Sequence, residues 1–343
     1  MNKEDRIKVI AFGEIMLRLK SPNQERFMQS AAFEATFGGS EFNVMASLSG
    51  LGISTSMISQ FPTNDMGEAC LKEVRSFGVN TDQISRHDAR MGQYFLEAGS
   101  NLRSGKVIYD RDHSAFTQLK RGDINWNDVF DGREWFHLSG ITPALSEELA
   151  ELSLEAVQVA QEKGLKVSFD FNYRDGLWAK NNLDARKVLG RIVENVNVLM
   201  ASAKDCKTCL DIEVTEDEGQ GRNFHLTQKM FDQFPQLDVM VSTFRNVISA
   251  DDNSMSAISR DRSGYNVGRE FRTRHIVDRI GSGDAFAAGL IYSLITEKSG
   301  EETLDFATAA AALKHSIVGD VNRVSQKEIN DLLDDKFTRQ INR

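Results

Sequence analysis

A segment near the C-terminus, residues 278–289, combines residue types that suit phosphoryl transfer. It reads Asp-Arg-Ile-Gly-Ser-Gly-Asp-Ala-Phe-Ala-Ala-Gly. Gly281 and Gly283 allow backbone N–H groups to converge on an anion. The apolar helix expected after them directs its positive dipole end to the same point. Asp284 would then lie beside a phosphate-sized pocket, where it could accept a proton from an alcohol.

The same residues also fit an ordinary loop before a helix, with Asp284 only capping that helix. Two other phosphate-binding patterns are absent from the sequence. No Lys-Ser or Lys-Thr follows a glycine loop at the Walker A spacing, and the third glycine of a dinucleotide fingerprint is missing. Spacing alone therefore leaves two interpretations open, an anion site and a capped loop.

Composition indicates a soluble globular protein. The chain is 41% hydrophobic and 27% charged. Its 343 residues are enough for one large α/β domain or two small ones. The net charge of −9 argues against wholesale nucleic-acid binding. The longest largely apolar run, residues 285–295, is shorter than the roughly 20 residues that span a bilayer, and the N-terminus does not resemble a signal peptide. We expect a cytoplasmic protein with neither nucleic acid nor membrane as partner.

The three cysteines are Cys70, Cys206 and Cys209. This odd number argues against a disulfide framework. Cys206 and Cys209 form a C-x-x-C that could be a redox pair or half of a zinc site. No second pair and no suitably spaced histidines accompany it, so we expect two thiols one helical turn apart.

Strand-like and helical patterns alternate along the chain. This alternation predicts a mainly parallel sheet covered by helices on both faces, a three-layer α/β fold. We expect strands at residues 9–15, 56–61, 135–138, 167–171, 196–200 and 239–243. Helices are expected at 42–51, at 67–77, and from an N-cap at Ser146 to a final glycine at Gly164.

Two regions, about residues 16–37 and 91–119, interrupt the alternation. The second reads as a hairpin that turns at Ser104-Gly105. About four such strands could form a small sheet beyond the carboxyl ends of the main strands, where ligands of open α/β sheets bind. A sheet placed there would be a lid that excludes water. We expect residues 1–343 to form a single domain.

Polar residues outside the glycine segment could hold a ligand. Gly38 and Gly39 permit close backbone approach, and Asn43 offers a donor and an acceptor to a hydroxyl-rich ligand. At the end of a strand, alternation places Asp170, Asn172 and Arg174 on one side. Arg174 could bind a carboxylate or phosphate in a bidentate pair. A buried ion pair between Asp170 and Arg174 is the alternative.

The hairpin contributes Tyr94, Tyr109 and Arg111. If these side chains face a cleft, they supply hydroxyl contacts and a second cation. If the tyrosines face outward, they pack the sheet or form a dimer surface. The six histidines are scattered and suggest no metal or acyl-transfer site.

Together these segments resemble the ribokinase-like sugar kinases, the family named for minor phosphofructokinase, from residue 13 to about residue 324. The ordered pair of signatures, Gly38-Gly39 and then Gly281-Ser282-Gly283-Asp284, carries the resemblance. Within the family, the chain is most similar to the 2-keto-3-deoxygluconate kinases. The segments that support this are 38–43, 94–95, 109–111, 170–174 with 177–178, 278–280, 313–316 and 319–322.

The resemblance implies ATP- and Mg²⁺-dependent phosphorylation of 2-keto-3-deoxygluconate to its 6-phosphate. It assigns Asp284 as the base and Gly281, Ser282 and Gly283 as the anion hole. The implied substrate contacts are Gly38, Gly39, Asn43, Tyr94, Tyr109, Arg111, Asn172 and Arg174. The implied nucleotide contacts are Thr243, Arg245, Lys314, His315 and Asn322. A monovalent cation, usually K⁺, is expected beside Asp278 and Ile280, and a dimer through the exposed lid strands.

Two departures from the family pattern stand out. Where the family has Asn-x-x-Glu, whose glutamate organises Mg²⁺ through water, this chain has Ser202 and Asp205. Arg245 stands where many relatives have a glycine near the nucleotide.

A helix N-terminus should lower the pKa of Asp284, which would weaken this carboxylate as a base. The alternatives are a kinase for another sugar or sugar acid and, with less support, a non-catalytic sugar-binding sensor.

Overall fold

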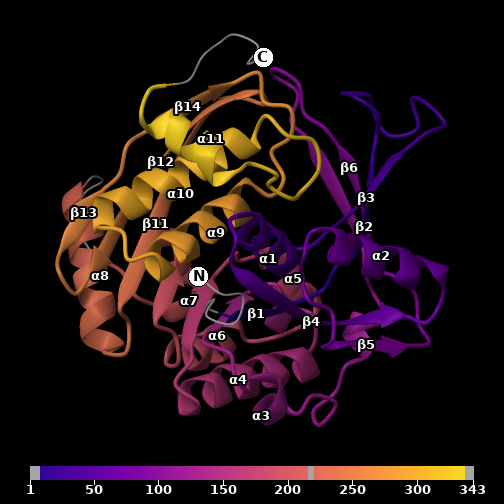
Figure 1. Ribbon diagram of the computed structural model, residues 1–343, viewed down its shortest axis with the longest axis horizontal. Helices are drawn as coiled ribbons and strands as arrows, with labels where there is room; N and C mark the ends of the chain where they lie inside the picture. Colours follow the sequence, from indigo (N-terminus) through magenta and orange to yellow (C-terminus); the bar gives the residue numbers. More distant parts are fainter. Residues whose placement is uncertain (1–7, 215–219, 337–343) are drawn as a thin grey trace.

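A large mixed sheet forms the centre of the computed structural model, which describes residues 8–214 and 220–336 (Figure 1). Within those residues the sheet has ten strands, and neighbours from β11 to β5 run parallel. The parallel part confirms the predicted fold class. In spatial order the strands are β13 (Tyr265–Val267), β12 (Asp252–Asp261), β11 (Val239–Ser249), β10 (Val198–Met200), β9 (Lys166–Asp170), β8 (Trp135–Ser139), β1 (Lys8–Phe12), β4 (Ser54–Pro62) and β5 (Ile84–His87), with β14 (Phe271–Arg274) also paired to β12.

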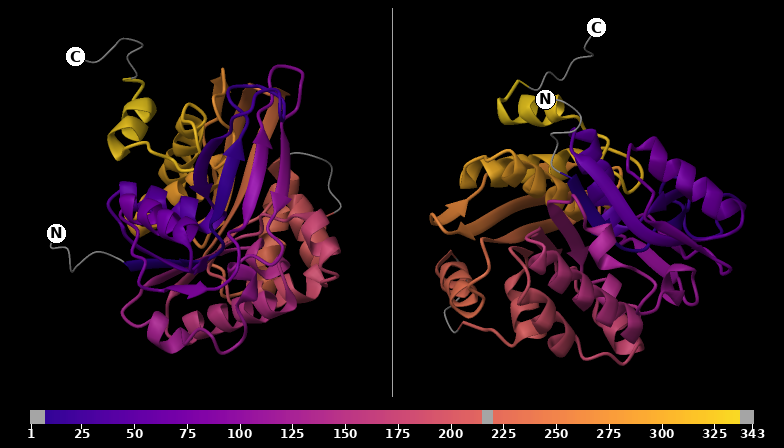
Figure 2. Two further views of the ribbon diagram at one scale, coloured as in Figure 1. Left: turned by 90° about the vertical axis from the view of Figure 1, so that its right-hand side faces the viewer. Right: turned by 60° about the horizontal axis from the view of Figure 1, so that its bottom comes forward.

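Helices cover both faces of this sheet and form two separate cores (Figure 2). Alternation along β1 shows why, because Ile10 and Phe12 join one core while Val9 and Ala11 join the other. One face carries α3 (Trp126–Val129), α4 (Glu147–Glu162), α5 (Asp175–Lys180), α6 (Ala185–Val193), α7 (Ala203–Leu210) and α8 (Gln220–Gln233). The other carries α1 (Ser40–Gly50), α2 (Asp65–Ser76), α9 (Ser282–Ile295), α10 (Gly300–Lys314) and α11 (Gln326–Leu333).

The two regions that interrupt the alternation form a separate four-stranded sheet, as predicted. Its order is β3 (Glu34–Gly38), β2 (Met16–Lys20), β6 (Gln93–Glu97) and β7 (Lys106–Asp110). The β6–β7 pair is the predicted antiparallel hairpin, and β2 lies parallel to β6. Figure 1 shows this sheet, hereafter the lid, projecting beside the main body.

The strand predicted at residues 9–15 was too long. β1 ends at Phe12, and the chain crosses to the lid at Met16. Gly13 follows the end of β1, and a Cβ atom there would overlap the carboxylate of Glu41. The strand predicted at 239–243 was too short, because β11 continues to Ser249 in a long antiparallel pairing with β12.

The predicted helix signals proved reliable. The Ser146 side chain accepts a hydrogen bond from the Leu149 N–H (3.1 Å) at the start of α4, and Gly164 adopts φ +76° after its end. Cys206 and Cys209 lie one turn apart on α7 as buried free thiols, as expected. Burial raises the pKa of Cys209 to about 12, so this thiol stays protonated at neutral pH. Across the described residues, every helix is too short or too polar to cross a membrane.

A buried arginine ties the lid to the main body. Arg18, on β2, forms ion pairs with both Asp278 and Asp320, and its side chain is 1% exposed. The Tyr94 hydroxyl, on β6, donates to Asp320 Oδ2 over 2.5 Å. In the sequence, Asp278 precedes α9 and Asp320 follows α10. One guanidinium therefore joins three segments that are far apart along the chain.

Replacing Arg18 by Met should destabilise the fold strongly. The change leaves two buried carboxylates without their counter-charge, which costs roughly 3–5 kcal/mol. The matched control is Arg272→Met, since the pair of Arg272 with Asp252 is partly exposed and should cost about 1 kcal/mol or less. Urea unfolding of both variants measures the difference, and equal losses would contradict the assigned role of Arg18.

Candidate active site

The lid and the carboxyl ends of the main strands enclose a cavity of about 810 Å³. Most of the predicted site residues meet there, although they come from distant segments. The cavity is lined by all the predicted anion-hole and substrate residues: Gly38, Gly39, Asn43, Tyr94, Tyr109, Arg111, Asn172, Arg174, Gly281, Ser282, Gly283 and Asp284. Arg245 and Ile280 also line it.

The glycine turn at the cavity floor can exist only with glycine at its first position. Gly281 has φ +81°, and a Cβ atom there would overlap the backbone carbonyl of Asp320. The α9 helix starts at Ser282, directly after this turn. Because the first N–H groups of an α-helix have no partner inside the helix, α9 presents free donors next to the cavity.

Asp284 is held by side chains of α1. Its Oδ1 accepts a hydrogen bond from the Ser40 hydroxyl (2.9 Å), and its Oδ2 accepts one from Asn43 Nδ2 (2.7 Å). Burial raises the pKa of Asp284 to about 6. The expected lowering was therefore wrong, because desolvation outweighs the hydrogen bonds and the helix terminus. Asp284 is a stronger base than its position on the helix suggested.

A second carboxylate lies nearby at the end of β9. Burial and, after it, the charge of Asp284 raise the pKa of Asp170 to about 7. Two carboxylates so placed titrate as a pair. Asp170 also stops the strand, because its Oδ1 accepts the Asn172 N–H (3.1 Å) and Asn172 turns to φ +37°. The predicted alternation through Arg174 was thus wrong, although all three side chains still line the cavity.

The arginines of the cavity differ in how their charge is balanced. Arg111 is paired with buried Glu14, to which its Nε and Nη2 atoms donate over 2.7 and 2.5 Å. Arg174 is exposed to the cavity. Its predicted alternative, an ion pair with Asp170, does not form, and the described part of the chain offers the Arg174 guanidinium no hydrogen bond or salt bridge. Arg174 is therefore the better candidate for binding an anionic ligand.

The two hairpin tyrosines both line the cavity, but to different extents. Tyr94 is buried, whereas Tyr109 is 55% exposed. Their rings lie 5.8 Å apart, and the Arg111 guanidinium lies 6.0 Å from the Tyr109 ring centroid. They make up one wall of the cavity, with Tyr109 at its rim.

The predicted nucleotide residues separate into two groups. Thr243 lines a small cavity of about 100 Å³ that Gly283 and Asp170 border as well. Lys314 and His315 are fully buried, and Asn322 is nearly so. They line neither the main cavity nor this small one.

These buried residues support the loop before the glycine turn. The Lys314 ammonium donates to the Ile317 carbonyl (3.2 Å) and more weakly to that of Asp278 (3.4 Å). The His315 ring contacts the Ala311 carbonyl (2.9 Å), and burial lowers its pKa to about 4. His315 is therefore neutral at neutral pH, and it has no free charge to offer a phosphate.

Asp205 borders the same small cavity as Thr243 and caps α7. Its Oδ2 accepts the Ser202 N–H (2.8 Å) and the Ser202 hydroxyl (2.6 Å). Together with Asp170, it places two carboxylates beside Gly283. Carboxylates are the protein ligands that Mg²⁺ prefers, directly or through water, so this donor set fits the metal.

The Asp278 carboxylate, beside which a monovalent cation was expected, already has several partners. Asp278 Oδ1 accepts the Ile280 N–H (3.1 Å), and Asp278 Oδ2 accepts the Gly319 N–H (3.2 Å). Arg18 already supplies a positive charge to the same carboxylate. Both oxygens thus have donors, and the monovalent cation stays a prediction.

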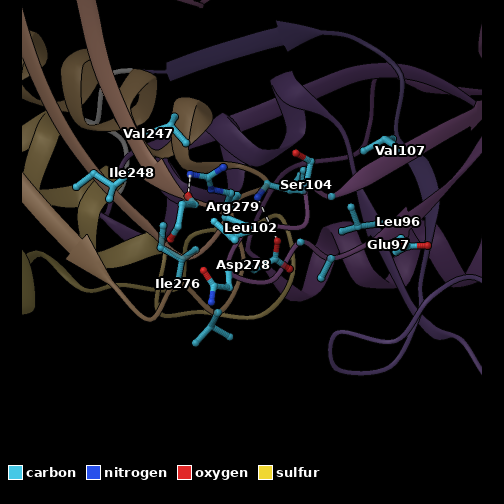
Figure 3. Close-up of a pocket in the computed structure, with 18 residues that line it drawn as sticks. Leu96, Glu97, Leu102, Ser104, Val107, Val247, Ile248, Ile276, Asp278 and Arg279 are labelled. Carbon is cyan, nitrogen blue, oxygen red and sulfur yellow. Dashed lines mark hydrogen bonds between the residues drawn. The ribbon is translucent and has the colours of Figure 1, made fainter.

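A second cavity of about 470 Å³ adjoins the main one (Figure 3). Its walls come from the lid loop, the β11–β12 turn and residues 276–280. The Ala250 N–H donates to the Asn101 carbonyl (2.8 Å), which joins the tip of the lid to the β11–β12 turn. Arg279 and Ile280 line both cavities and so form the wall between them.

Sequence reasoning missed several residues of the site. Ser40, Asp170 and Asp320 lie inside segments that the sequence pattern pointed to, but only neighbouring residues were expected to contact a ligand. Arg18 lies between Leu17 and Leu19, and a charge at that place in a lid strand is the signal that could have identified it. Glu41 is buried and accepts the Ser139 N–H (3.1 Å) and hydroxyl (2.7 Å). Burial raises the pKa of Glu41 to about 7.

Known proteins resemble this chain over nearly its whole length. A crystal structure of 2-dehydro-3-deoxygluconokinase from Thermotoga maritima shares 39% identity and a TM-score of 0.91, covering 96% of this chain and all of that one. The 2-dehydro-3-deoxygalactonokinase of Haloferax volcanii is 33% identical over 95% of this chain and 96% of its own. The 5-dehydro-2-deoxygluconokinase of Bacillus licheniformis is 25% identical over 92% and 93%.

The match to a protein family extends over both the main body and the lid. Residues 6–326 match the model of the pfkB family carbohydrate kinases. That range includes the main sheet, the lid, the glycine turn, Asp170 and Asp284. The chain belongs to the pfkB family of carbohydrate kinases.

Proposed function

We propose that this protein transfers the γ-phosphoryl group of ATP to the primary hydroxyl of 2-keto-3-deoxygluconate, giving the 6-phosphate. The observation that carries the proposal is the position of Asp284. It is a carboxylate with a raised pKa, held by Ser40 and Asn43 at the start of α9, in one cavity with the unpaired Arg174. Base, anion donors and an acceptor-side cation are thus within one enclosed space.

The reaction follows from this arrangement. The acceptor hydroxyl oxygen forms a bond to the γ-phosphorus, and the bond from that phosphorus to the bridging oxygen of ATP breaks. ADP leaves with the electron pair, and the hydroxyl proton passes to Asp284. The turn of Gly281, Ser282 and Gly283 would donate N–H groups to the phosphoryl oxygens. The lid would keep water from replacing the acceptor.

Membership of a carbohydrate kinase family implies the use of ATP and Mg²⁺. Asp205 and Asp170 would hold the metal directly or through water, next to Thr243 on the nucleotide side. Bound there, Mg²⁺ would neutralise charge on the phosphate groups. Because Asp205 also caps α7, its side chain has little freedom to move toward the metal.

The proposed class of acceptor, a sugar acid, is inferred from the charge of Arg174. A neutral sugar would leave the Arg174 guanidinium without a partner in a partly desolvated cavity, whereas a sugar acid would supply a carboxylate. Two of the relatives above are named for 2-keto-3-deoxy sugar acids, the gluconate and the galactonate forms, which are epimers. We therefore expect the acceptor to be a sugar acid, and one of these two epimers to be the preferred acid.

We also propose that the protein forms a dimer through the lid. β7 is an edge strand whose Val107, Ile108 and Tyr109 side chains are 37%, 53% and 55% exposed. An uncovered apolar edge strand favours pairing with another strand. Sedimentation should give the mass of a dimer for the wild type and of a monomer for Ile108→Lys, and a monomeric wild type would exclude the proposal.

A coupled assay of ADP release with a panel of sugars separates the candidate functions. Turnover with 2-keto-3-deoxygluconate or its galactonate epimer supports a sugar-acid kinase. Turnover with neutral sugars alone indicates a kinase for another substrate. Binding of a sugar acid without any turnover indicates a sensor.

Asp284→Asn should lower kcat by ~10²–10⁴ while sugar binding largely survives, because the amide keeps the shape but cannot accept the proton. In the wild type the base must be ionised. Its raised pKa therefore predicts that kcat/KM falls as the pH drops below about 6–7, where the Asp284–Asp170 pair becomes protonated. Steady-state kinetics from pH 5 to 9 test both points. Near-normal turnover of the variant would refute the assignment of the base.

Arg174→Met should raise KM for a sugar acid by ~10-fold or more, which is the typical loss for a charge-assisted contact. KM for a neutral sugar of the same length should change much less, because that sugar has no carboxylate to lose. Steady-state kinetics with both acceptors make the comparison. Equal effects on the two sugars would refute the carboxylate role.

A further inference from the structure

Among the described residues, three arginines of the main cavity have no carboxylate partner of their own. Arg174, Arg245 and Arg279 all line it. Within residues 8–214 and 220–336, none of these three guanidinium groups forms an ion pair, unlike Arg111, which is paired with Glu14. Two cations therefore remain after Arg174 is matched with an acid acceptor.

Arg245 contacts the anion hole itself. It lies on β11, two residues after Thr243, and its Nη2 atom donates to the Ser282 hydroxyl over 2.9 Å. Ser282 is the first residue of α9, in the turn that would bind the phosphoryl group. The guanidinium is thus beside the point where the negative charge of a transferring group would develop.

Arg279 lies two residues before Gly281 and lines both cavities. Figure 3 shows its guanidinium joined to a neighbouring oxygen, which is the Ser249 carbonyl at 3.2 Å from Arg279 Nη2. Its Nε atom is buried without a hydrogen-bond partner. A buried donor without an acceptor is costly, and an oxygen atom of a bound anion would satisfy it.

These two arginines also repel each other. Burial and, after it, the charge of Arg279 lower the pKa of Arg245. Like charges kept together in a partly desolvated site are stabilised when an anion binds between or beside them. Their position next to Ser282 favours a phosphate over the sugar carboxylate, for which Arg174 is available.

We propose that Arg245 and Arg279 are catalytic residues that hold the γ-phosphoryl group of the nucleotide and stabilise it during transfer. This inference rests on the kinase reaction proposed above and adds a division of labour among the three arginines. Arg174 binds the acceptor, whereas Arg245 and Arg279 bind the group that moves. Charge on the equatorial oxygens of that group is then met by two guanidiniums and by the N–H groups of α9.

Nucleotide binding without any sugar tests the proposal first. Calorimetry compares ADP with the non-hydrolysable ATP analogue AMP-PNP, each with Mg²⁺, in the wild type and in the variants Arg245→Met, Arg279→Met and the double variant. The wild type should prefer AMP-PNP, and the double variant should lose most of that preference, by roughly tenfold or more. Arg174→Met should keep the preference, as should Arg262→Met, a control far from the cavity on an exposed loop.

Steady-state kinetics of the same variants are the second test of the proposal. Each single variant should lower kcat by ~10²-fold, as for removal of one transition-state donor, with KM for the sugar acid within about threefold of wild type. Arg245→Lys should recover part of the rate, because it restores the charge. Thermal melting curves check that each variant is folded. If the Met variants melt early, the Lys variants at both positions are compared with Arg174→Lys in the same nucleotide assay.

Three results would overturn the proposal. They are a wild type that binds both nucleotides equally, a double variant that keeps the wild-type preference, and a loss of sugar-acid affinity with kcat unchanged. The last would assign these arginines to the sugar carboxylate instead. Because the nucleotide arm contains no sugar, it gives its answer even if 2-keto-3-deoxygluconate proves not to be the acceptor.

Discussion

The ion pairs of Arg18 with Asp278 and Asp320 are the interaction on which the site depends. Asp278 precedes the glycine turn and Asp320 follows α10, so the turn lies between two anchored points. The Asp320 carbonyl also occupies the space that a side chain on Gly281 would need. One guanidinium from the lid therefore fixes the loop of the proposed anion hole, together with Tyr94 in the cavity wall.

The cavity shows how one environment can favour both charge and proton transfer. Burial raises the pKa of Asp284 to about 6, and Arg174, Arg245 and Arg279 in the same cavity have no carboxylate partner among the described residues. A well-hydrated site would have given a weaker base and weaker cations. The low-dielectric cavity makes an unpaired base and unpaired cations costly when it is empty, and a bound anionic substrate would relieve that cost.

Residues whose environment is set locally could be predicted from the sequence. Ser146 and Gly164 follow capping rules, and the Gly281 turn follows from the freedom of glycine, so the order of elements and the core of the site were accessible. The direction of the pKa shift of Asp284 could not be predicted, because it depends on burial by segments some 240 residues away. Lys314 and His315 fall near the site in the sequence pattern, yet the end of α10 buries both.

The bridge made by Arg18 also limits how this scaffold can be re-engineered. Two of the proposed acceptor contacts, Tyr109 and Arg111, lie on or directly after the lid hairpin, whereas the proposed transfer residues belong to a segment far along the chain. That separation invites exchange of the hairpin to change substrate choice. Tyr94, however, donates to the carboxylate that Arg18 holds. A grafted lid must therefore keep Arg18 and Tyr94 as a unit, or it will alter the anion hole together with the specificity.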